Sequence, residues 1–135
     1  MPVSLDFGAY YRHADTIDGI EVPIALSNGR QSVELFRKLD TGAANCIFER
    51  RYAEILGLDV ESGWLQRFRT VAGSFGAYQH EVTIQTLGIE FSAVVFFAQD
   101  APFRRNFLGR SRWLDRLRIA LVDYDRTLFL SAYQS

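Results

Sequence analysis

The chain has 135 residues, with 15 basic and 16 acidic side chains and a formal net charge of −1. This length suits one domain, and a content of 48% hydrophobic and 14% aromatic residues is enough for a packed core, which excludes a disordered or fibrous protein. The balanced charge excludes a protein that relies on a basic surface to hold phosphate backbones, so we expect no nucleic-acid partner.

The number of cysteine and histidine residues and the length of the apolar runs limit the kinds of protein that this chain can be. Cys46 is the single cysteine, which excludes an intrachain disulfide. Residues 1–11 lack the basic start and apolar stretch of a signal peptide, and no apolar run reaches the ~20 residues that cross a bilayer. We therefore expect a cytoplasmic protein without a membrane partner. His13 and His80 are far apart and lack ligand-spaced neighbours, so we expect no metal site and no other cofactor.

The first 18 residues mix polar and aromatic side chains, and we interpret them as an N-terminal arm or irregular lead-in to a domain at residues 19–135. From Ile20 to Leu26 apolar residues alternate with polar or small ones, which predicts a half-buried strand. Asn28-Gly29 suits a two-residue type I′ hairpin turn. That turn pairs Ile24 with Val33 and Val22 with Leu35, and the second strand ends at Leu39.

The middle of the chain predicts one helix followed by more strands. Phe48, Tyr52, Ile55 and Leu56 have helical spacing, and Gly57 suits the helix end. We expect a strand at 68–71, a hairpin tip at 72–77, a strand at 78–86, a turn at 87–88 and a strand at 89–98.

The last third of the chain begins with a break at Asp100-Ala101-Pro102. Ser111 can cap a helix whose apolar side carries Trp113, Leu114 and Leu117, and residues 119–122 and 127–130 predict a final hairpin. Many short strands with one or two short helices predict a mostly-β protein, with a closed or sandwiched barrel as its architecture.

The segment Leu39-Asp40-Thr41-Gly42-Ala43 is the part of the sequence that carries chemistry. By itself Asp-Thr-Gly is only a turn signal, but here it follows a hairpin strand and precedes a short helical pattern. Phe107-Leu108-Gly109-Arg110 lies much later in the chain, and a glycine-containing hairpin lies between the two segments. This order resembles the retropepsin-like aspartic proteases, over about residues 20–130.

The resemblance implies a small closed barrel of the acid-protease type and assigns roles to particular residues. Asp40 would be catalytic, and the active-site loop would be completed by Thr41, Gly42 and Ala43. The flap over bound peptide would comprise Ala72, Gly73, Ser74, Phe75 and Gly76. The apolar step that crosses beneath the Asp loop would be formed by Phe107, Leu108 and Gly109.

An aspartic peptidase needs two carboxylates around one water, and this chain contains a single Asp-Thr-Gly. We therefore expect a homodimer with Asp40 near its two-fold axis, acting on an extended peptide or protein substrate. Two alternatives remain open at this point. The chain could be a catalytically silent module that keeps this fold for dimerisation or peptide binding, or a monomeric β-barrel binder in which the Asp-Thr-Gly is accidental.

Overall fold

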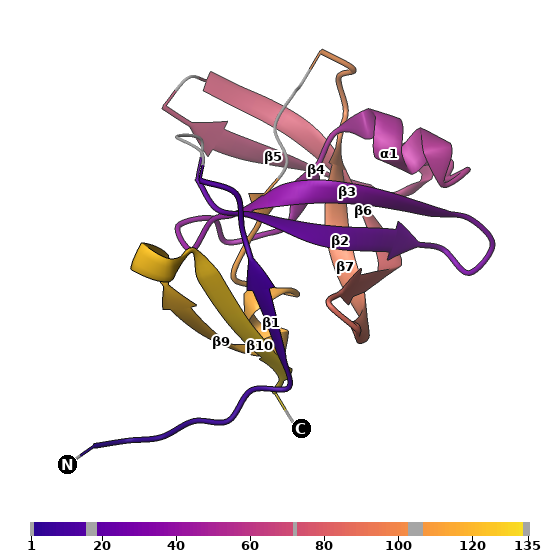
Figure 1. Cartoon of the computed structure of the whole chain (residues 1–135). Helices are drawn as coiled ribbons and strands as arrows, with labels where there is room; N and C mark the ends of the chain where they lie inside the picture. Colours follow the sequence, from indigo (N-terminus) through magenta and orange to yellow (C-terminus); the bar gives the residue numbers. More distant parts are fainter. Residues whose placement is uncertain (1, 16–18, 72, 103–106, 134–135) are drawn as a thin grey trace.

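The computed structural model describes residues 2–15, 19–71, 73–102 and 107–133. The chain is mostly β, as predicted (Figure 1). The elements in chain order are β1 (Ala9–Arg12), β2 (Glu21–Ser27), β3 (Ser32–Leu39), β4 (Ile47–Phe48), α1 (Arg50–Ile55), η1 (Val60–Ser62), β5 (Trp64–Thr70), β6 (Gly73–Thr86), β7 (Ile89–Ala98), β8 (Phe107–Leu108), η2 (Leu114–Arg116), β9 (Leu117–Val122), η3 (Asp123–Asp125) and β10 (Thr127–Ala132).

Within the described residues the strands form two sheets. The larger sheet has seven strands in the order β2-β3-β8-β4-β7-β6-β5, and β2 also pairs with β6. The pairings of β2, β3, β8, β4, β7 and β6 therefore form a continuous ring around the core, and β5 extends it on the outside of β6. The smaller sheet has the order β1-β10-β9, so the segment 9–12 within the first 18 residues is a strand paired with the end of the chain.

The β2–β3 hairpin is confirmed, but its predicted register is wrong by two residues. Ile24 pairs with Leu35 and Leu26 with Val33, so the connection has four residues, 28–31, in place of two. The Asn28 side chain explains the longer loop, because its Oδ1 accepts hydrogen bonds from the backbone N–H groups of Arg30 and Gln31. A shift of two residues keeps every side chain on its predicted face.

The predicted helix is confirmed in part. α1 begins at Arg50 and Leu56 caps it, with Gly57 next at φ 73°, but Phe48 belongs to the short strand β4 and not to the helix. Phe48 pairs with Phe97 of β7 in register and is completely buried. Tertiary pairing therefore overrides the helical spacing that Phe48 shares with Tyr52.

The two strands after α1 are longer than the sequence predicted. β5 begins at Trp64, and β6 already begins at Gly73, with Thr70 paired opposite Gly73. The predicted tip at 72–77 is therefore wrong for residues 73–77, which are strand, and Ala72 lies outside the described residues. The predicted turn at Leu87-Gly88 is confirmed, since both residues have positive φ angles, 49° and 85°, between the paired residues Thr86 and Ile89.

The helix predicted after Ser111 is wrong. The structure has a short 3₁₀ turn, η2, whose N-cap is Trp113 without a side-chain cap. Arg112 would be the first residue of a helix capped by Ser111, but its φ of 75° lies outside the right-handed helical region, and this prevents an α-helix from starting there. The predicted final hairpin is confirmed as β9 and β10.

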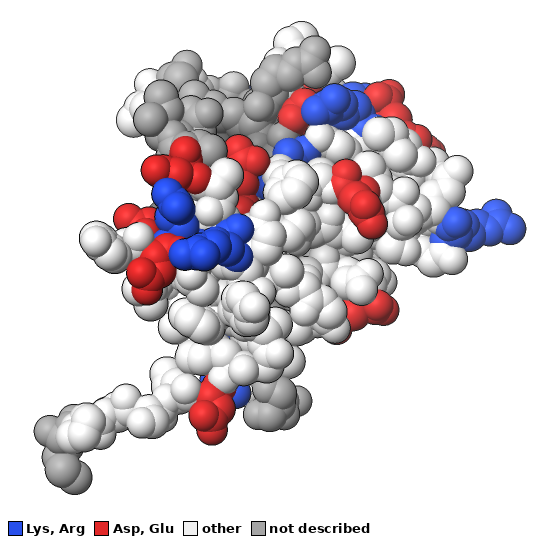
Figure 2. Space-filling view, in the orientation of Figure 1, with Lys and Arg blue, Asp and Glu red and all other residues white. Residues whose placement is uncertain are grey.

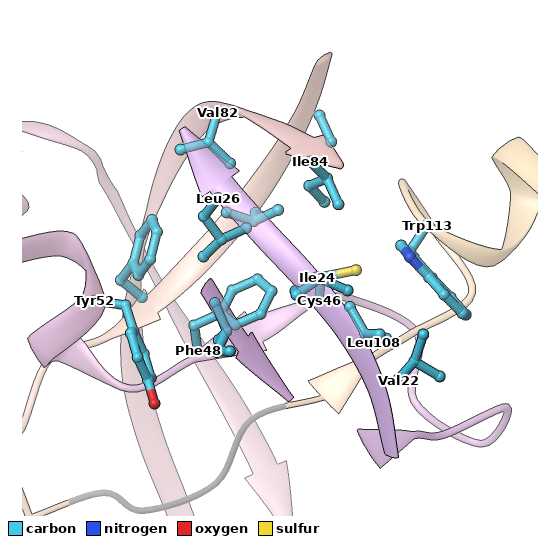
Figure 3. Close-up of a cluster of buried hydrophobic side chains, with 14 of the residues drawn as sticks. Val22, Ile24, Leu26, Cys46, Phe48, Tyr52, Val82, Ile84, Leu108 and Trp113 are labelled. Atoms are coloured by element: carbon cyan, nitrogen blue, oxygen red, sulfur yellow. The ribbon is translucent and has the colours of Figure 1, made fainter. Parts of the chain in front are cut away.

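Both sheets contribute to one main core. Its completely buried side chains include Leu26, Phe48, Phe97 and Trp113, and Leu128 and Leu130 come from the smaller sheet. Figure 3 shows labelled side chains from β2, β4, β6 and β8, with Trp113, converging on the same volume. Because Val22, Ile24 and Leu26 alternate inward along β2, the residues between them face outward.

Candidate active site

Asp40 lies directly after the last residue of β3, at a point fixed by two neighbouring segments. The Leu39 N–H donates to the Ile20 carbonyl at 2.9 Å, and the Asp40 N–H donates to the Leu108 carbonyl at 3.1 Å. Leu39 packs against the main core, so strand alternation directs Asp40 to the opposite side of the sheet. The Asp40 side chain is half-buried in the single chain.

The loop after Asp40 is held by its own side chain. The Gly42 N–H donates to Asp40 Oδ1 at 2.9 Å, and the Ala43 N–H donates to the Asp40 carbonyl at 3.2 Å. This is the local arrangement that Asp favours at strand ends, with the side chain bonding the backbone two residues on. Thr41 makes no such bond in this loop and is exposed, and Ala43 is half-buried.

Gly109 is the residue that lets two distant segments cross. A Cβ atom at this position would lie 2.7 Å from the carbonyl carbon of Asn45 and 2.9 Å from the carbonyl oxygen of Ala43, too close for any real side chain. Two hydrogen bonds continue the contact, from the Arg110 N–H to the Ala43 carbonyl and from the Ser111 N–H to the Ala44 carbonyl, each at 2.9 Å. Leu108 is paired with Leu39 in parallel. The structure thus brings the Asp40 loop and the Phe107-Leu108-Gly109 segment together.

A second, smaller apolar cluster lies on the Asp40 side of the sheet, and sequence reasoning missed it. It consists of Ile47, Ala77 and Phe96, with Phe68 and Phe75 packed against them. Phe48 and Phe97 face the main core, so their neighbours Ile47 and Phe96, which pair with each other, face the opposite side. A signal for this cluster was present, since Val95, Phe96 and Phe97 are apolar without alternation, which is typical of a strand covered on both faces.

The β5–β6 hairpin is attached through this cluster. Phe68 of β5 stacks on Phe75 of β6 with ring centres 5.4 Å apart, and it meets the Phe96 ring edge-on at 5.1 Å. Of the predicted flap residues, Gly73 and Ser74 are exposed and Phe75 is half-buried. The rings therefore anchor the hairpin at the pair Phe68 and Phe75, two residue pairs before the last pair of the hairpin, Thr70 and Gly73.

Gly76 has a close packing role in this hairpin. A Cβ there would lie 2.6 Å from Gln99 Oε1 and 3.1 Å from Leu65 Cδ1, and its carbonyl accepts a hydrogen bond from the Gln99 N–H at 2.9 Å. Beside it is a surface hollow of about 370 Å³ lined by Phe75, Gly76, Ala98, Asp100 and Pro102. The hairpin and the exit of β7 thus form a wall with room for a side chain.

The basic residues of β3 that precede Asp40 do not point at its carboxylate. The Arg37 guanidinium lies over the Tyr52 ring, 4.6 Å from its centre, and donates to the Tyr52 hydroxyl, which also accepts from Arg51 at 2.8 Å. Burial lowers the pKa of Arg37, against the opposing effect of Tyr52 and Glu49. The Lys38 chain lies against Gly19.

Cys46, His13 and His80 occupy positions that suit packing and hydrogen bonding within the fold. Cys46 is 1% exposed, and burial raises the pKa of its thiol to about 11, so the thiol stays protonated and is a poor nucleophile. A ring nitrogen of His80 lies 2.8 Å from the Val60 carbonyl, and His13 is buried. Among residues 2–15, 19–71, 73–102 and 107–133, no three His, Cys, Asp or Glu side chains are grouped for a metal ion. In the same ranges no helix has the length and hydropathy of a membrane span.

Comparison with proteins of known structure identifies the fold in which this site lies. The sequence matches no protein-family model and no curated protein. The structure is similar to that of a retropepsin-like aspartic protease from Rickettsia conorii, with a TM-score of 0.63 and 17% identity, covering 91% of this chain and 97% of the other. It is also similar to EIAV protease complexed with the inhibitor HBY-793, with a TM-score of 0.55 and 18% identity, covering 72% of this chain and 86% of the other. The predicted fold class is thereby confirmed: the chain has the fold of retropepsin-like proteases.

Proposed function

We propose that the chain is an aspartic endopeptidase that works as a homodimer, with Asp40 of each copy forming the catalytic pair. The observation that carries this proposal is the position of Asp40. Its carboxylate leaves the sheet on the side away from the main core, in a loop fixed by Leu108 and Gly109, next to an apolar cluster and a long hairpin. The similarity of fold to two proteases supports the same reading of the loop.

The chemistry requires two carboxylates in different protonation states. An ionised carboxylate takes a proton from the attacking water, and a protonated one polarises the peptide carbonyl. Two negative charges ~4 Å apart repel by about 4 kcal/mol at an effective dielectric constant of 20, so the pair holds one proton over a window of roughly three pH units. The two pKa values belong to the pair and not to either residue. A single copy supplies one carboxylate and is therefore expected to be inactive.

The residues around Asp40 would hold the pair in place. Thr41 is exposed in the single chain, so its hydroxyl is free to reach the neighbouring loop of the second copy. Gly42 and Ala43 turn the loop back toward Gly109, where the backbone bonds make it rigid. A rigid loop is useful because a displacement of about 1 Å between catalytic groups can cost ~100-fold in rate.

Substrate would lie as an extended segment between the Asp40 loop and the β5–β6 hairpin. Peptide that pairs its backbone with a strand is held mainly by main-chain hydrogen bonds, while pockets for alternate side chains give the preference. The apolar cluster of Ile47, Phe68, Phe75 and Phe96 would line one such pocket. We therefore expect cleavage between residues with apolar neighbours, with the hairpin as the flap.

Incubation of the purified chain with a mixed peptide library at mildly acid pH tests the proposal, beside Asp40→Asn as the matched variant. We expect cleavage by the original chain and a loss of at least 1000-fold in the variant, because the amide can neither accept the proton nor complete the pair. Equal cleavage by both proteins would contradict the proposal. No cleavage under any condition by a dimer would favour the silent dimerisation or peptide-binding module.

A further inference from the structure

The outward face of β2 and its neighbours carries an ordered arrangement of side chains that the proposed catalytic site does not use. Pro23, Ala25 and Ser27 alternate with the buried residues of β2 and so face outward. In Figure 2 the surface over β2 and β3 is a broad area with few charges. Antiparallel pairing continues this outer face across β3, β6 and β7 in rows, because directly paired residues point to the same side.

The first row is apolar and borders a hollow. Phe36 pairs with Pro23, and the Thr86 hydroxyl donates to the Pro23 carbonyl at 3.1 Å, which brings Leu87 of the adjoining turn alongside. Phe36 is 53% exposed, an unusual position for a phenylalanine. The small residues of β2 lie between larger side chains of β3 and β6, so the surface sinks to a hollow of about 510 Å³ lined by residues that include Pro23, Ala25, Glu34, Phe36, Gln85 and Leu87.

The second row is acidic. It runs across four strands as Glu34, Ala25, Gln85 and Glu90. Glu34 and Glu90 are exposed and stand at its two ends, three strand spacings or about 14 Å apart. Neither carboxylate forms an ion pair with another residue in the described part of the chain. Beyond Phe36 the next pair is Lys38 with Glu21, whose opposite charges balance each other, so Glu34 and Glu90 are the acidic groups of these rows that have no cation beside them among the described residues.

The third row carries hydroxyl groups, of which the Ser92 hydroxyl already donates to Glu81 Oε1 at 3.1 Å. It consists of four hydroxyl side chains, Ser32, Ser27, Thr83 and Ser92. Arg116 reaches the Ser92 carbonyl at 3.5 Å, but its charge is next to Asp115 at 3.8 Å. Apolar, acidic and hydroxyl rows therefore follow one another along the same face.

On β3 this face is the side to which Asp40 also points, but Phe36 precedes Asp40 by four residues, or about 13 Å. Glu90 is near the turn of the β6–β7 hairpin, whereas Phe96 of the small apolar cluster is six residues farther along β7, or about 20 Å. A ligand on the outer face cannot add a strand, because β2 is already paired on both sides, with β3 and with β6. It must lie across the side chains and be recognised by them.

We propose that this outer face binds a segment of a partner protein in which a large apolar side chain is flanked by Lys or Arg. The apolar side chain enters the hollow between Phe36 and Leu87, and the flanking cations meet Glu34 and Glu90. The hydroxyl row bonds the polar backbone of the segment. A volume of about 510 Å³ is within the range of ~300–1,000 Å³ usual for ligand sites and fits one large side chain with its neighbours.

Fluorescence anisotropy with a labelled peptide, Gly-Ser-Lys-Phe-Lys-Ser-Gly, tests the proposal. The Asp40→Asn chain is used so that the probe is not cleaved. We expect saturable binding that is lost when both lysines of the probe are replaced by glutamate. Glu34→Lys and Glu90→Lys should each weaken binding at least 10-fold, and Phe36→Ser should do the same. Asp123→Lys makes the same charge change in η3, away from this face, and should leave binding unchanged.

Circular dichroism of each variant checks that it is folded, and hydrogen exchange of the peptide complex gives a second measurement that needs no variant. We expect protection of amides in 83–91. Absence of probe binding, equal binding by all variants, or protection confined to 64–79 would overturn the proposal. A dimer that dissociates on Phe36→Ser in sedimentation would also overturn it, because a second copy would then be the occupant.

Discussion

Asp40 is positioned by residues that are almost 70 positions away in the chain. The Leu108 carbonyl accepts its N–H, and the backbone at Gly109 passes so close to Ala43 and Asn45 that only glycine fits. Cys46 belongs to the same crossing, since its Sγ lies 3.6 Å from the Ser111 carbonyl. At the scale of single residues, the site thus depends on the lack of a side chain at Gly109 as well as on the Asp40 carboxylate.

Gly109→Ala should destabilise the fold. The added Cβ would overlap backbone atoms of Asn45 and Ala43, which cannot move without breaking the Asp40 loop. Overpacking of this kind costs about 1–3 kcal/mol, and we expect a fall of roughly 3–12 °C in the midpoint of thermal unfolding. Circular dichroism measures it. Gly8→Ala is the matched control, because its Cβ would meet only Ser131 Oγ at an ordinary 3.7 Å, and an equal effect of both changes would contradict the prediction.

The Cys46 thiol should be inert in the folded protein. With its pKa raised by burial to about 11, almost no thiolate exists at pH 8, and we expect iodoacetamide to modify the residue only after unfolding in urea. The folded pKa is above the ordinary 9.0, so the unfolded chain loses its proton first. The contribution of the protonated Cys46 thiol to the free energy of unfolding is therefore complete below pH 9 and declines as the pH rises toward 11. Rapid modification of the native protein at pH 8, measured by mass spectrometry, would show the prediction to be wrong.

At the scale of elements, the β5–β6 hairpin is the largest extension outside the ring of paired strands. Among the strands that the structure describes, β5 pairs with β6 alone, and most of its residues are exposed. The hairpin is held against the rest of the molecule by the rings of Phe68, Phe75 and Phe96. Pairing of β6 with β7 begins at Ala77, so the part of the hairpin before it, held by these rings and by the Gly76–Gln99 hydrogen bond, is the part that can open without disturbing the main core.

Phe68→Ala should loosen this hairpin and leave the main core intact. Two aromatic contacts would be lost, which is worth about 1–3 kcal/mol in local stability. Hydrogen exchange should show faster exchange of amides in 65–79 with unchanged protection in β2 and β3. Cleavage efficiency (kcat/KM) should fall in the same variant, because a loosened hairpin would hold the substrate less well. Trp64→Ala, at a residue that is 83% exposed in the same strand, is the control and should alter neither. Global loss of protection in Phe68→Ala would argue against an independent hairpin.

At the scale of the whole molecule, the proposed chemistry cannot be completed by one chain. The fold places one Asp40 carboxylate outside the core, and a two-fold axis would bring its copy beside it. The hollow on the outer face lies about 13 Å along β3 from Asp40, and Glu90 lies about 20 Å along β7 from Phe96, so a dimer contact confined to the Asp40 loops would leave the hollow open for another protein. Catalysis and partner binding would then be separable properties of the same small domain.

Mixing experiments should reveal the shared site. When equal amounts of the original chain and Asp40→Asn are unfolded together and refolded, about one quarter of the dimers carry two Asp40 carboxylates. We expect the total cleavage rate to fall to about that fraction of the rate given by the same total amount of original chain. Refolding of equal amounts of the original chain and Asp123→Asn, a change in η3, is the control and should leave the rate unchanged. A rate of one half would mean that each chain acts alone.

The sequence by itself determined the elements whose signals are local. The alternation along β2, the Leu87-Gly88 turn and the end of β3 at Asp40 all follow from side-chain periodicity and turn chemistry within a few residues. The relation between the Asp-Thr-Gly loop and the Phe107-Leu108-Gly109 segment is predicted by the resemblance of their order to that of retropepsin-like proteases.

Only the tertiary structure decided the features that depend on contacts between distant segments. Phe48 is strand because β7 pairs with it, and the Asn28 side chain that holds the four-residue turn also donates to the distant Leu56 carbonyl. The small cluster around Ile47 and Phe96, and the rows of the outer face, arise from pairing between strands. Backbone hydrogen bonds and burial across the chain outweigh local preference wherever the two conflict, because a few tenths of a kcal/mol of propensity are small against a buried ring or an unpaired N–H.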